Sequence, residues 1–197
     1  MTHGHADSTS SPAHRVRVME QLLEDAGVVT GAELDGFLDR LPATSSPANG
    51  AKAVARAWTD APFRARLLAD GNAAIAELGF AVGGGPAVVL RVVENTELVH
   101  NVIVCTLCSC YPLGLLGPSP SWYKSEAYRA RVVRDPRPVL AEFGFYPPDD
   151  VAINVWDANA ETRYLVLPRR PAGTDGLSDA ALAGLVTRRG LIGTAAV

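Results

Sequence analysis

Apolar residues recur along the first fifty residues with the spacing of amphipathic helices. A first helix is predicted over about 13–26, because Ser11-Pro12 is a typical helix start and Gly27 a typical end. The capping-box sequence Thr30-Gly31-Ala32-Glu33 opens a second helix. The apolar positions on the two helices are Val16, Met19, Leu22, Leu23, Leu34, Phe37 and Leu38. Such short helices cannot bury these positions alone, so they are expected to pack either on the chain's own core or on a partner.

The chain is therefore divided into three parts. Residues 1–12 are small and polar and are predicted to form a disordered tail. Residues 13–50 form an N-terminal helical arm that ends in a linker at Leu41–Gly50. Residues 51–197 form the main domain, which is long enough for a sizeable core.

The main domain mixes helical patterns with apolar, β-branched runs, which indicates an α+β fold around one core. Helices are predicted over residues 51–58, 61–69, 72–78, Ser121–Val133, 138–143 and from Ser178 to about Arg188. Strands are predicted over residues 87–93, 99–104, 151–156 and 162–167. The remaining segments, Gly83–Pro86, Leu113–Pro120 and Arg169–Gly176, are expected to be turns or irregular.

Charge and hydropathy exclude several classes of protein. The formal net charge is −3, so no basic field attracts nucleic acid or an anionic membrane. No apolar run reaches the ~18 residues of a membrane-spanning helix. The N-terminus lacks the basic and apolar regions of a secretory signal, so a cytoplasmic protein is expected.

All three cysteines lie in the segment Cys105-Thr106-Leu107-Cys108-Ser109-Cys110, which we call the cysteine loop. A disulfide framework would spread its cysteines along the chain, so this pattern favours metal or redox chemistry. The spacing lacks the second Cys-x-x-Cys or His pair of a structural zinc site. Three buried cysteines acting as small apolar residues are the alternative. His100, five residues upstream, is interpreted as a hydrogen-bonded structural residue rather than a ligand.

A mononuclear metal needs more donors than three sulfurs, and the nearest are main-chain amides. The nitrogens of Ser109 and Cys110 lie between the sulfurs of Cys108 and Cys110, so these four donors can define a plane, with the Cys105 sulfur on an axis. Deprotonated amides require a strongly Lewis-acidic, trivalent ion. One octahedral position then stays open, as a catalytic metal requires.

The segment Val104–Tyr111 resembles the metal claw of nitrile hydratase α subunits of the cobalt type, in which Thr occupies position 106 where iron enzymes have Ser. Further segments that resemble the family are Ala53–Trp58, Val93–Thr96, His100–Val102, Trp122–Lys124, Tyr128–Val133, Glu161–Tyr164 and Arg170–Thr174. The resemblance covers roughly residues 15–195.

The resemblance implies a four-layer α-β-β-α core, with the arm wrapped on a β subunit of one or two chains. It implies one Co(III) per α subunit, bound by Cys105, Cys108, Ser109 and Cys110, with Cys108 oxidised to sulfinic acid and Cys110 to sulfenic acid. The β subunit contributes arginines to the oxidised sulfurs, and an activator protein delivers cobalt. No other cofactor is expected.

The implied reaction, part of nitrogen compound metabolism, is hydration of a small-molecule nitrile to its amide by a hydro-lyase. Cys110 and Ser109 are the predicted catalytic residues, Cys110 as nucleophile or base and Ser109 either orienting the sulfurs or only fitting the loop. Arg163 is interpreted as a support for the loop or as a surface salt bridge. The arginines at 129–137 are assigned to an interface or solvated helix, and Trp122 with Tyr123 to packing or the pocket.

Two departures from the family pattern concern the substrate. Many relatives have Trp-Pro where this chain has Leu113-Gly114, which predicts a larger or looser site mouth and a bulky or heteroaromatic nitrile. Toyocamycin nitrile hydratase, acting on a nucleoside, is a relative of that kind. Pro86 stands where some relatives have an active-site glutamine. The rival interpretations are the cobalt subunit of thiocyanate hydrolase, a non-catalytic metal-binding subunit and a structural zinc module.

Overall fold

The computed structural model describes residues 11–85, 87–108 and 110–197, without the side chains of Pro12 and 40–43. The described chain falls into two units, which divide between Ala43 and Thr44. The predicted tail lies mostly outside the described residues, and the expected division at residue 50 stays a prediction.

The N-terminal unit consists of α1 (Pro12–Asp25) and most of α2 (Gly31–Thr44). The predicted capping box is confirmed, since Thr30 N donates to Glu33 Oε2 at 2.9 Å and Glu33 N donates to Thr30 Oγ1 at 3.2 Å. Met19, Leu22 and Phe37 are exposed. Two helices without a third element therefore leave much of their apolar surface uncovered.

Residues 41–50 are not the linker that the sequence predicts. They contain the end of α2 and the first turn of α3 (Pro47–Thr59). The cause is a second Ser-Pro helix start, because the Ser46 side chain accepts a hydrogen bond from Ala48 N at 3.2 Å and Pro47 occupies the first turn.

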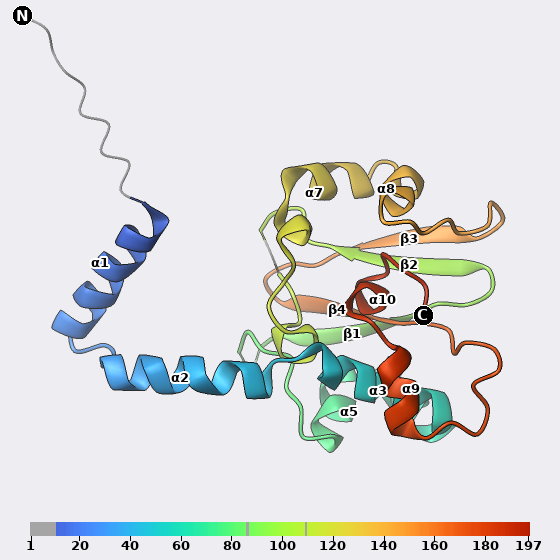
Figure 1. Cartoon of the computed structure of the whole chain (residues 1–197), viewed down its shortest axis with the longest axis horizontal. Coiled ribbons are helices and arrows are strands. Elements are labelled where there is room, and N and C mark those ends of the chain that lie inside the picture. The colour runs from blue at the N-terminus through green and yellow to red at the C-terminus, as the bar shows by residue number, and fades with distance from the viewer. Residues whose placement is uncertain (1–10, 86, 109) are drawn as a thin grey trace, which may run out of the picture. The chain divides into compact units, whose positions relative to one another are not determined.

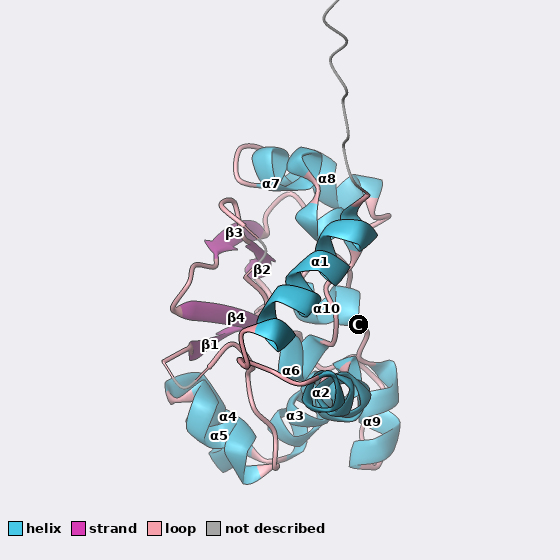
Figure 2. Ribbon diagram, turned by 90° about the vertical axis from the view of Figure 1, so that its left-hand side faces the viewer, coloured by secondary structure: helices cyan, strands magenta, loops and turns pink. Residues whose placement is uncertain are grey.

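The larger unit has the expected four layers, α-β-β-α, which Figures 1 and 2 show from two directions. One outer layer holds α7 (Glu126–Val132) and α8 (Pro136–Glu142). The other holds α3 together with α4 (Ala61–Ala69), α5 (Gly71–Glu77) and α9 (Asp179–Leu185). The α+β prediction is thus confirmed.

Two small parallel sheets form the inner layers. One pairs β1 (Val89–Glu94) with β4 (Thr162–Leu167), and the other pairs β2 (Val99–Val104) with β3 (Ala152–Asp157). Buried side chains of both sheets and the flanking helices form one core. Since β2 and β3 are parallel, with Val104 opposite Asp157, their carboxyl ends meet at one edge.

Three shorter elements differ from the prediction. Leu113–Leu116 forms α6 instead of irregular chain. The helix expected from Ser121 begins as a 3-10 turn (Ser121–Lys124), because Ser125 caps α7 by accepting from Tyr128 N at 3.2 Å. The last predicted helix ends earlier than expected, at Leu185, and Thr187 caps a separate α10 (Arg188–Ile192) that was not predicted.

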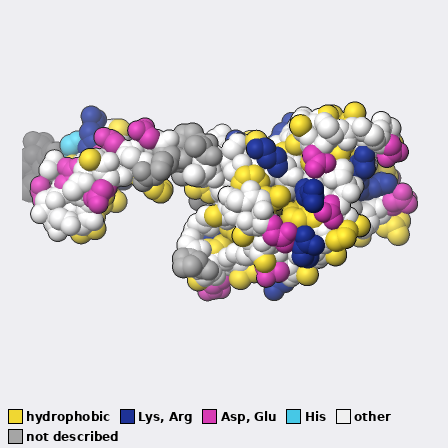
Figure 3. All heavy atoms as spheres, turned by 90° about the horizontal axis from the view of Figure 1, so that it is seen from below, with side chains coloured by type: hydrophobic (Ala, Val, Ile, Leu, Met, Phe, Trp, Pro, Cys, Tyr) yellow, Lys and Arg dark blue, Asp and Glu magenta, His cyan; other side chains and the backbone are white. Residues whose placement is uncertain are grey.

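Charged side chains of both signs alternate on the face of the larger unit seen in Figure 3. Arginines of the larger unit form ion pairs such as Arg56–Asp60 and Arg66–Glu77, each at 2.8 Å. None of the described helices combines the length and the apolar character needed to cross a bilayer. The cytoplasmic location stays a prediction.

Candidate metal centre

The cysteine loop begins where β2 ends. Cys105 follows Val104, the last residue of the strand, and its side chain is 0% exposed. Cys108 is exposed and Cys110 is partly buried. The loop therefore starts on rigid, buried backbone and turns toward solvent, so that a group bound by its sulfurs is accessible from outside the core.

The three sulfurs converge on one point, all lying within 4.8 Å of one another. Cys108 Sγ lies 3.4 Å from Cys105 Sγ and 3.1 Å from Cys110 Sγ. With metal–sulfur bonds of about 2.3 Å, sulfurs lie roughly 3.3 Å apart at a right angle and about 3.8 Å apart in a tetrahedron. Both separations of the Cys108 sulfur are closer to the right-angle value, which is compatible with neighbouring vertices of an octahedron.

Asp157, the last residue of β3, holds the first turn of the loop. Its Oδ1 accepts a hydrogen bond from Thr106 N at 2.9 Å, and its Oδ2 accepts one from Thr106 Oγ1 at 2.6 Å. The carboxylate reaches the loop because β3 pairs with β2 in parallel, which brings Asp157 opposite Val104. No local pattern predicts this contact, because it joins residues 51 positions apart.

Side chains from the α7 layer fix the loop from another direction. Arg129 Nη1 lies 3.2 Å from Cys108 O and 3.4 Å from Thr106 O, donating to both. Tyr123 OH donates to Cys110 O at 3.1 Å, and Tyr128 OH donates to Ile103 O in the strand before the loop at 2.8 Å. Arg129 was assigned from sequence to an interface or solvated helix, and its role at the loop was missed.

Burial raises the pKa of Cys110 to about 12, with a further rise from the hydrogen bond with Cys108 and an opposing effect of the positive charge of Arg163. The thiol of Cys110 therefore keeps its proton at neutral pH until a metal displaces it. The donor set of three converging cysteine sulfurs suits a soft or borderline metal ion.

The structure resolves two of the open interpretations. His100 is buried, with Nε2 2.7 Å from Gly193 O and Nδ1 3.2 Å from Asn95 Nδ2, so the structural interpretation is confirmed. Arg163 is 9% exposed and forms no ion pair among the described residues, so the surface salt bridge is wrong. Its Nη1 donates instead to carbonyls of the turn before β4, including Ala160 O at 3.2 Å.

The remaining predicted residues divide into packing residues and undescribed ones. Trp122 packs against Tyr128 and Phe143 with ring centroids 5.0 and 4.7 Å apart, and Tyr123 is 1% exposed, so its ring is part of the core while its hydroxyl contacts Cys110 O. Ser109, predicted as a metal ligand and catalytic residue, and Pro86 lie outside the described residues.

The Leu113-Gly114 segment is packed more tightly than expected. Gly114 N donates to Val82 O at 2.9 Å, which a proline there would prevent. A Cβ added at Gly114 would lie 1.9 Å from Ala81 O. The expected loosening of this segment is therefore wrong, whereas a larger site mouth at Leu113 stays a prediction.

Substituting Gly114→Ala is expected to lower the free energy of unfolding by about 1–3 kcal/mol, because the new methyl group meets rigid backbone. The matched control is Gly184→Ala in α9, where an added Cβ meets nothing within 4 Å. This control should gain about 0.5–1 kcal/mol from the better helix propensity of Ala. Denaturant unfolding of both variants measures the difference. Equal stability of Gly114→Ala and the wild type would contradict the close packing.

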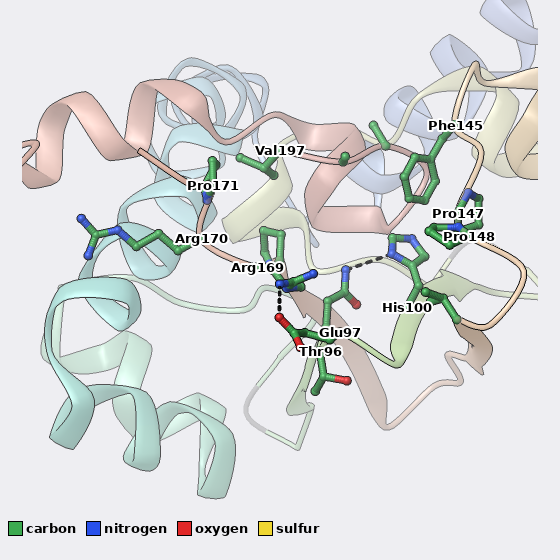
Figure 4. A pocket seen from close by; sticks show the side chains of 16 residues that line it. Thr96, Glu97, His100, Phe145, Pro147, Pro148, Arg169, Arg170, Pro171 and Val197 are labelled. Carbon is green, nitrogen blue, oxygen red and sulfur yellow. Dashed lines mark hydrogen bonds and ion pairs between the residues drawn. The ribbon is translucent and has the colours of Figure 1, made fainter. Parts of the chain in front are cut away.

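A separate cavity of about 410 Å³ lies at the other end of β2. His100, near the start of that strand, lines it together with Phe145, Pro147 and Arg169, whose guanidinium pairs with Glu97 at 2.9 Å (Figure 4). None of the three cysteines lines this cavity. It is therefore not part of the candidate metal centre.

Comparison with known proteins identifies the family. The family model "Nitrile hydratase, alpha chain" matches residues 10–195. The low-molecular-weight cobalt-containing nitrile hydratase subunit alpha of Rhodococcus rhodochrous is 52% identical over 186 residues, which cover 94% of this chain and 89% of that protein. The thiocyanate hydrolase subunit gamma of Thiobacillus thioparus is 45% identical over 161 residues, which cover 77% of this chain and 66% of that protein.

Among solved structures, a double mutant of the iron-type nitrile hydratase from Comamonas testosteroni Ni1 superimposes with a TM-score of 0.88 at 45% identity, covering 93% of this chain and 89% of that one. The fold, the converging cysteine sulfurs and the match over nearly the whole length all indicate the same family. The chain belongs to the nitrile hydratase α-chain family, whose members are enzymes of the hydro-lyase type.

Proposed function

We propose that this chain is the metal-carrying α subunit of a cobalt nitrile hydratase, which adds water across a carbon–nitrogen triple bond to give an amide. The observation that carries the proposal is the convergence of the Cys105, Cys108 and Cys110 sulfurs, all within 4.8 Å of one another, with Cys108 Sγ 3.4 Å from Cys105 Sγ and 3.1 Å from Cys110 Sγ. The printed names of the relatives that contain cobalt support the choice of metal.

In this proposal one Co(III) is bound by the sulfurs of Cys105, Cys108 and Cys110 and by the main-chain nitrogens of Ser109 and Cys110. When bound, the ion supplies Lewis-acid activation of nitrile or water. Cys108 carries a sulfinic and Cys110 a sulfenic acid. The Cys110 oxygen then acts as nucleophile or base toward the nitrile carbon or water, and Ser109 orients the oxidised sulfurs.

Contacts within this chain hold the loop ready for that chemistry. Asp157 fixes Thr106, Arg129 fixes the Thr106 and Cys108 carbonyls, and Tyr123 fixes the Cys110 carbonyl. These bonds use main-chain groups near the cysteines and the Thr106 hydroxyl, so they orient the loop without occupying a sulfur. Such supporting hydrogen bonds typically change metal affinity or activity by about 10- to 100-fold.

The proposed partners are a β subunit of one or two chains and a cobalt-delivery activator. Exposed apolar side chains on α1 and α2, such as Met19, Leu22 and Phe37, support an arm that packs on the β subunit. Activity is therefore expected only from the assembled complex supplied with cobalt.

The thiocyanate hydrolase relative makes a second activity testable. The complex should be offered a nitrile and thiocyanate in separate assays. Formation of the amide from the nitrile, without carbonyl sulfide or ammonia from thiocyanate, is the expected result. Hydrolysis of thiocyanate without hydration of any nitrile would overturn the proposed function.

For the substrate, we propose a bulky or heteroaromatic nitrile, because by the family resemblance Leu113 stands where many relatives have a tryptophan. Leu113 is partly exposed and follows the loop by three residues. The variant Leu113→Trp is expected to lower kcat/KM for a heteroaromatic or nucleoside nitrile about tenfold relative to acrylonitrile. This corresponds to about 1.4 kcal/mol of activation free energy, because the larger side chain crowds the larger substrate. An unchanged ratio, or a wild-type preference for acrylonitrile, would contradict the assignment.

A further inference from the structure

The strand β1 has one edge that its own sheet does not cover. Its hydrogen bonds to β4 involve Val89, whose N–H donates to Glu161 O at 2.7 Å, and then every second residue. The main-chain groups of Leu90 and Val92 therefore point to the opposite edge, where β1 pairs with no strand in the described part of the chain. Such an edge is a template for a further strand unless something covers it.

A side chain of α5 already bonds to this edge in the manner of a strand. Asn72 Nδ2 donates to Val88 O at 2.8 Å, and Leu90 N donates to Asn72 Oδ1 at 2.6 Å. A carbonyl and the N–H two residues later are the groups that a neighbouring parallel strand uses. Val92, two residues further on, has no such partner among the described residues. This chain therefore provides strand-type bonds at the first half of the edge only.

A groove of about 580 Å³ follows the free edge, on the side of β1 where α4 and α5 lie (Figure 2). Residues 88–93 line it together with residues 68–70 from the end of α4, Trp156 of β3 and Tyr164 of β4. The rings of Trp156 and Tyr164 are partly exposed, with centroids 5.4 Å apart, and Val89 is 47% exposed. The groove thus places main-chain groups beside apolar surface, as binding sites for extended peptides do.

Arg91 gives the groove a positive charge that needs a partner. Side chains alternate along a strand, so Arg91 lies on the same face as Val89 and Val93. It is exposed and pairs with no carboxylate within the described ranges. Asp70, also in the lining, caps α5 instead by accepting from Ala73 N at 3.0 Å. An extended segment with an acidic side chain opposite Arg91 and apolar side chains beside it fits this surface.

The groove lies next to the candidate metal centre. Trp156 lines it, and the following residue, Asp157, holds the cysteine loop through Thr106. A subunit that covers the metal centre therefore reaches the groove without crossing the molecule, and under the proposed function this is the β subunit. A helix of that subunit could not bond to the strand edge, because its main-chain groups bond within the helix.

We infer that the free edge of β1 is a docking site for an extended, acidic segment of the β subunit, which adds a strand to the β1–β4 sheet. The inference rests on the proposed function for the presence of that subunit. A second copy of this chain fits less well, because pairing two β1 edges about a two-fold axis near their middle would bring Arg91 close to its own copy.

The test uses the cobalt-supplied complex of α and β subunits. A photo-crosslinking residue is placed at Val89, and mass spectrometry identifies the peptide that it captures. Arg91→Glu reverses the charge in the groove, and Lys52→Glu, at an exposed position of α3 outside the groove lining, is the matched control. The dissociation constant of the subunits is measured for both. Amide exchange at Val92 is compared between the complex and the full α chain alone, with Leu90, whose N–H already has a partner, as internal control.

The crosslink is expected within one extended segment of the β subunit that contains Asp or Glu. Arg91→Glu should weaken subunit binding at least about tenfold, because like charges then face each other, and Lys in place of the captured acidic residue should restore most of it. The Val92 amide should exchange at least about tenfold more slowly in the complex, and the Leu90 amide should change less.

Capture of a second α chain or of no protein overturns the inference. Equal binding by Arg91→Glu and Lys52→Glu, or unchanged exchange at Val92, does the same. A wild-type complex that crosslinks as expected but hydrates no nitrile would overturn the proposed function alone.

Discussion

Replacing Cys110 with serine is expected to abolish nitrile hydration, by at least about 10³-fold, and to lower the cobalt content of the complex. The serine oxygen is a harder donor than a thiolate sulfur, and a hydroxyl is far less acidic than a thiol. It also cannot be oxidised to a sulfenic acid. The sulfur lost is one that lies 3.1 Å from Cys108 Sγ. Amide production and cobalt per α chain are the measurements.

Leu107→Ala is the matched control for cobalt content, because this side chain lies in the same loop and is 84% exposed. It should retain the metal. A Cys110→Ser complex that keeps full cobalt and hydrates nitriles at the wild-type rate would show that the Cys110 sulfur is neither ligand nor reactant.

Asp157→Asn is expected to give the second largest effect. The substitution removes the negative charge and leaves one acceptor for the two Thr106 donors, which now lie 2.9 and 2.6 Å from the carboxylate oxygens. Charge-assisted bonds of this kind are the stronger ones. We expect kcat and cobalt retention to fall about 10- to 100-fold, as is typical for groups that orient metal ligands.

Two further variants distinguish the effect of the Asp157 contact with Thr106 from the effect of overall charge. Thr106→Val loses the hydroxyl bond alone, so its kcat and cobalt retention should fall between those of the wild type and Asp157→Asn. Asp150→Asn changes net charge equally at an exposed position before β3 and should have no effect. Equal losses in Asp150→Asn and Asp157→Asn would mean that overall charge, and not the contact with Thr106, is responsible.

Local pattern was sufficient to predict most elements of the larger unit. The strands Val99–Val104 and Thr162–Leu167 have the bounds expected from their β-branched residues. Prediction failed where a single capping residue determines where a helix begins. Ser46-Pro47 starts a helix within a segment whose composition is typical of a linker, and Thr187 caps α10 where the last predicted helix was expected to end.

The candidate site was predictable only as far as its local spacing allows. The three cysteines lie within six residues, so their convergence follows from the sequence. The groups that hold the loop in place could not be predicted from the sequence. Asp157 and Arg129 approach it through strand pairing and helix packing across 51 and 21–23 residues, and the buried, ion-pair-free state of Arg163 depends on the turn before β4.

The coordination of cobalt in the assembled, metal-supplied complex tests the central claim most directly. X-ray absorption should give a six-coordinate site with mixed sulfur and nitrogen ligands. The loop peptide should carry about 32 Da of added mass on Cys108 and about 16 Da on Cys110, for two oxygens and one. A closed tetrahedral sulfur site with unmodified cysteines, or an ion held by other residues, would contradict the account.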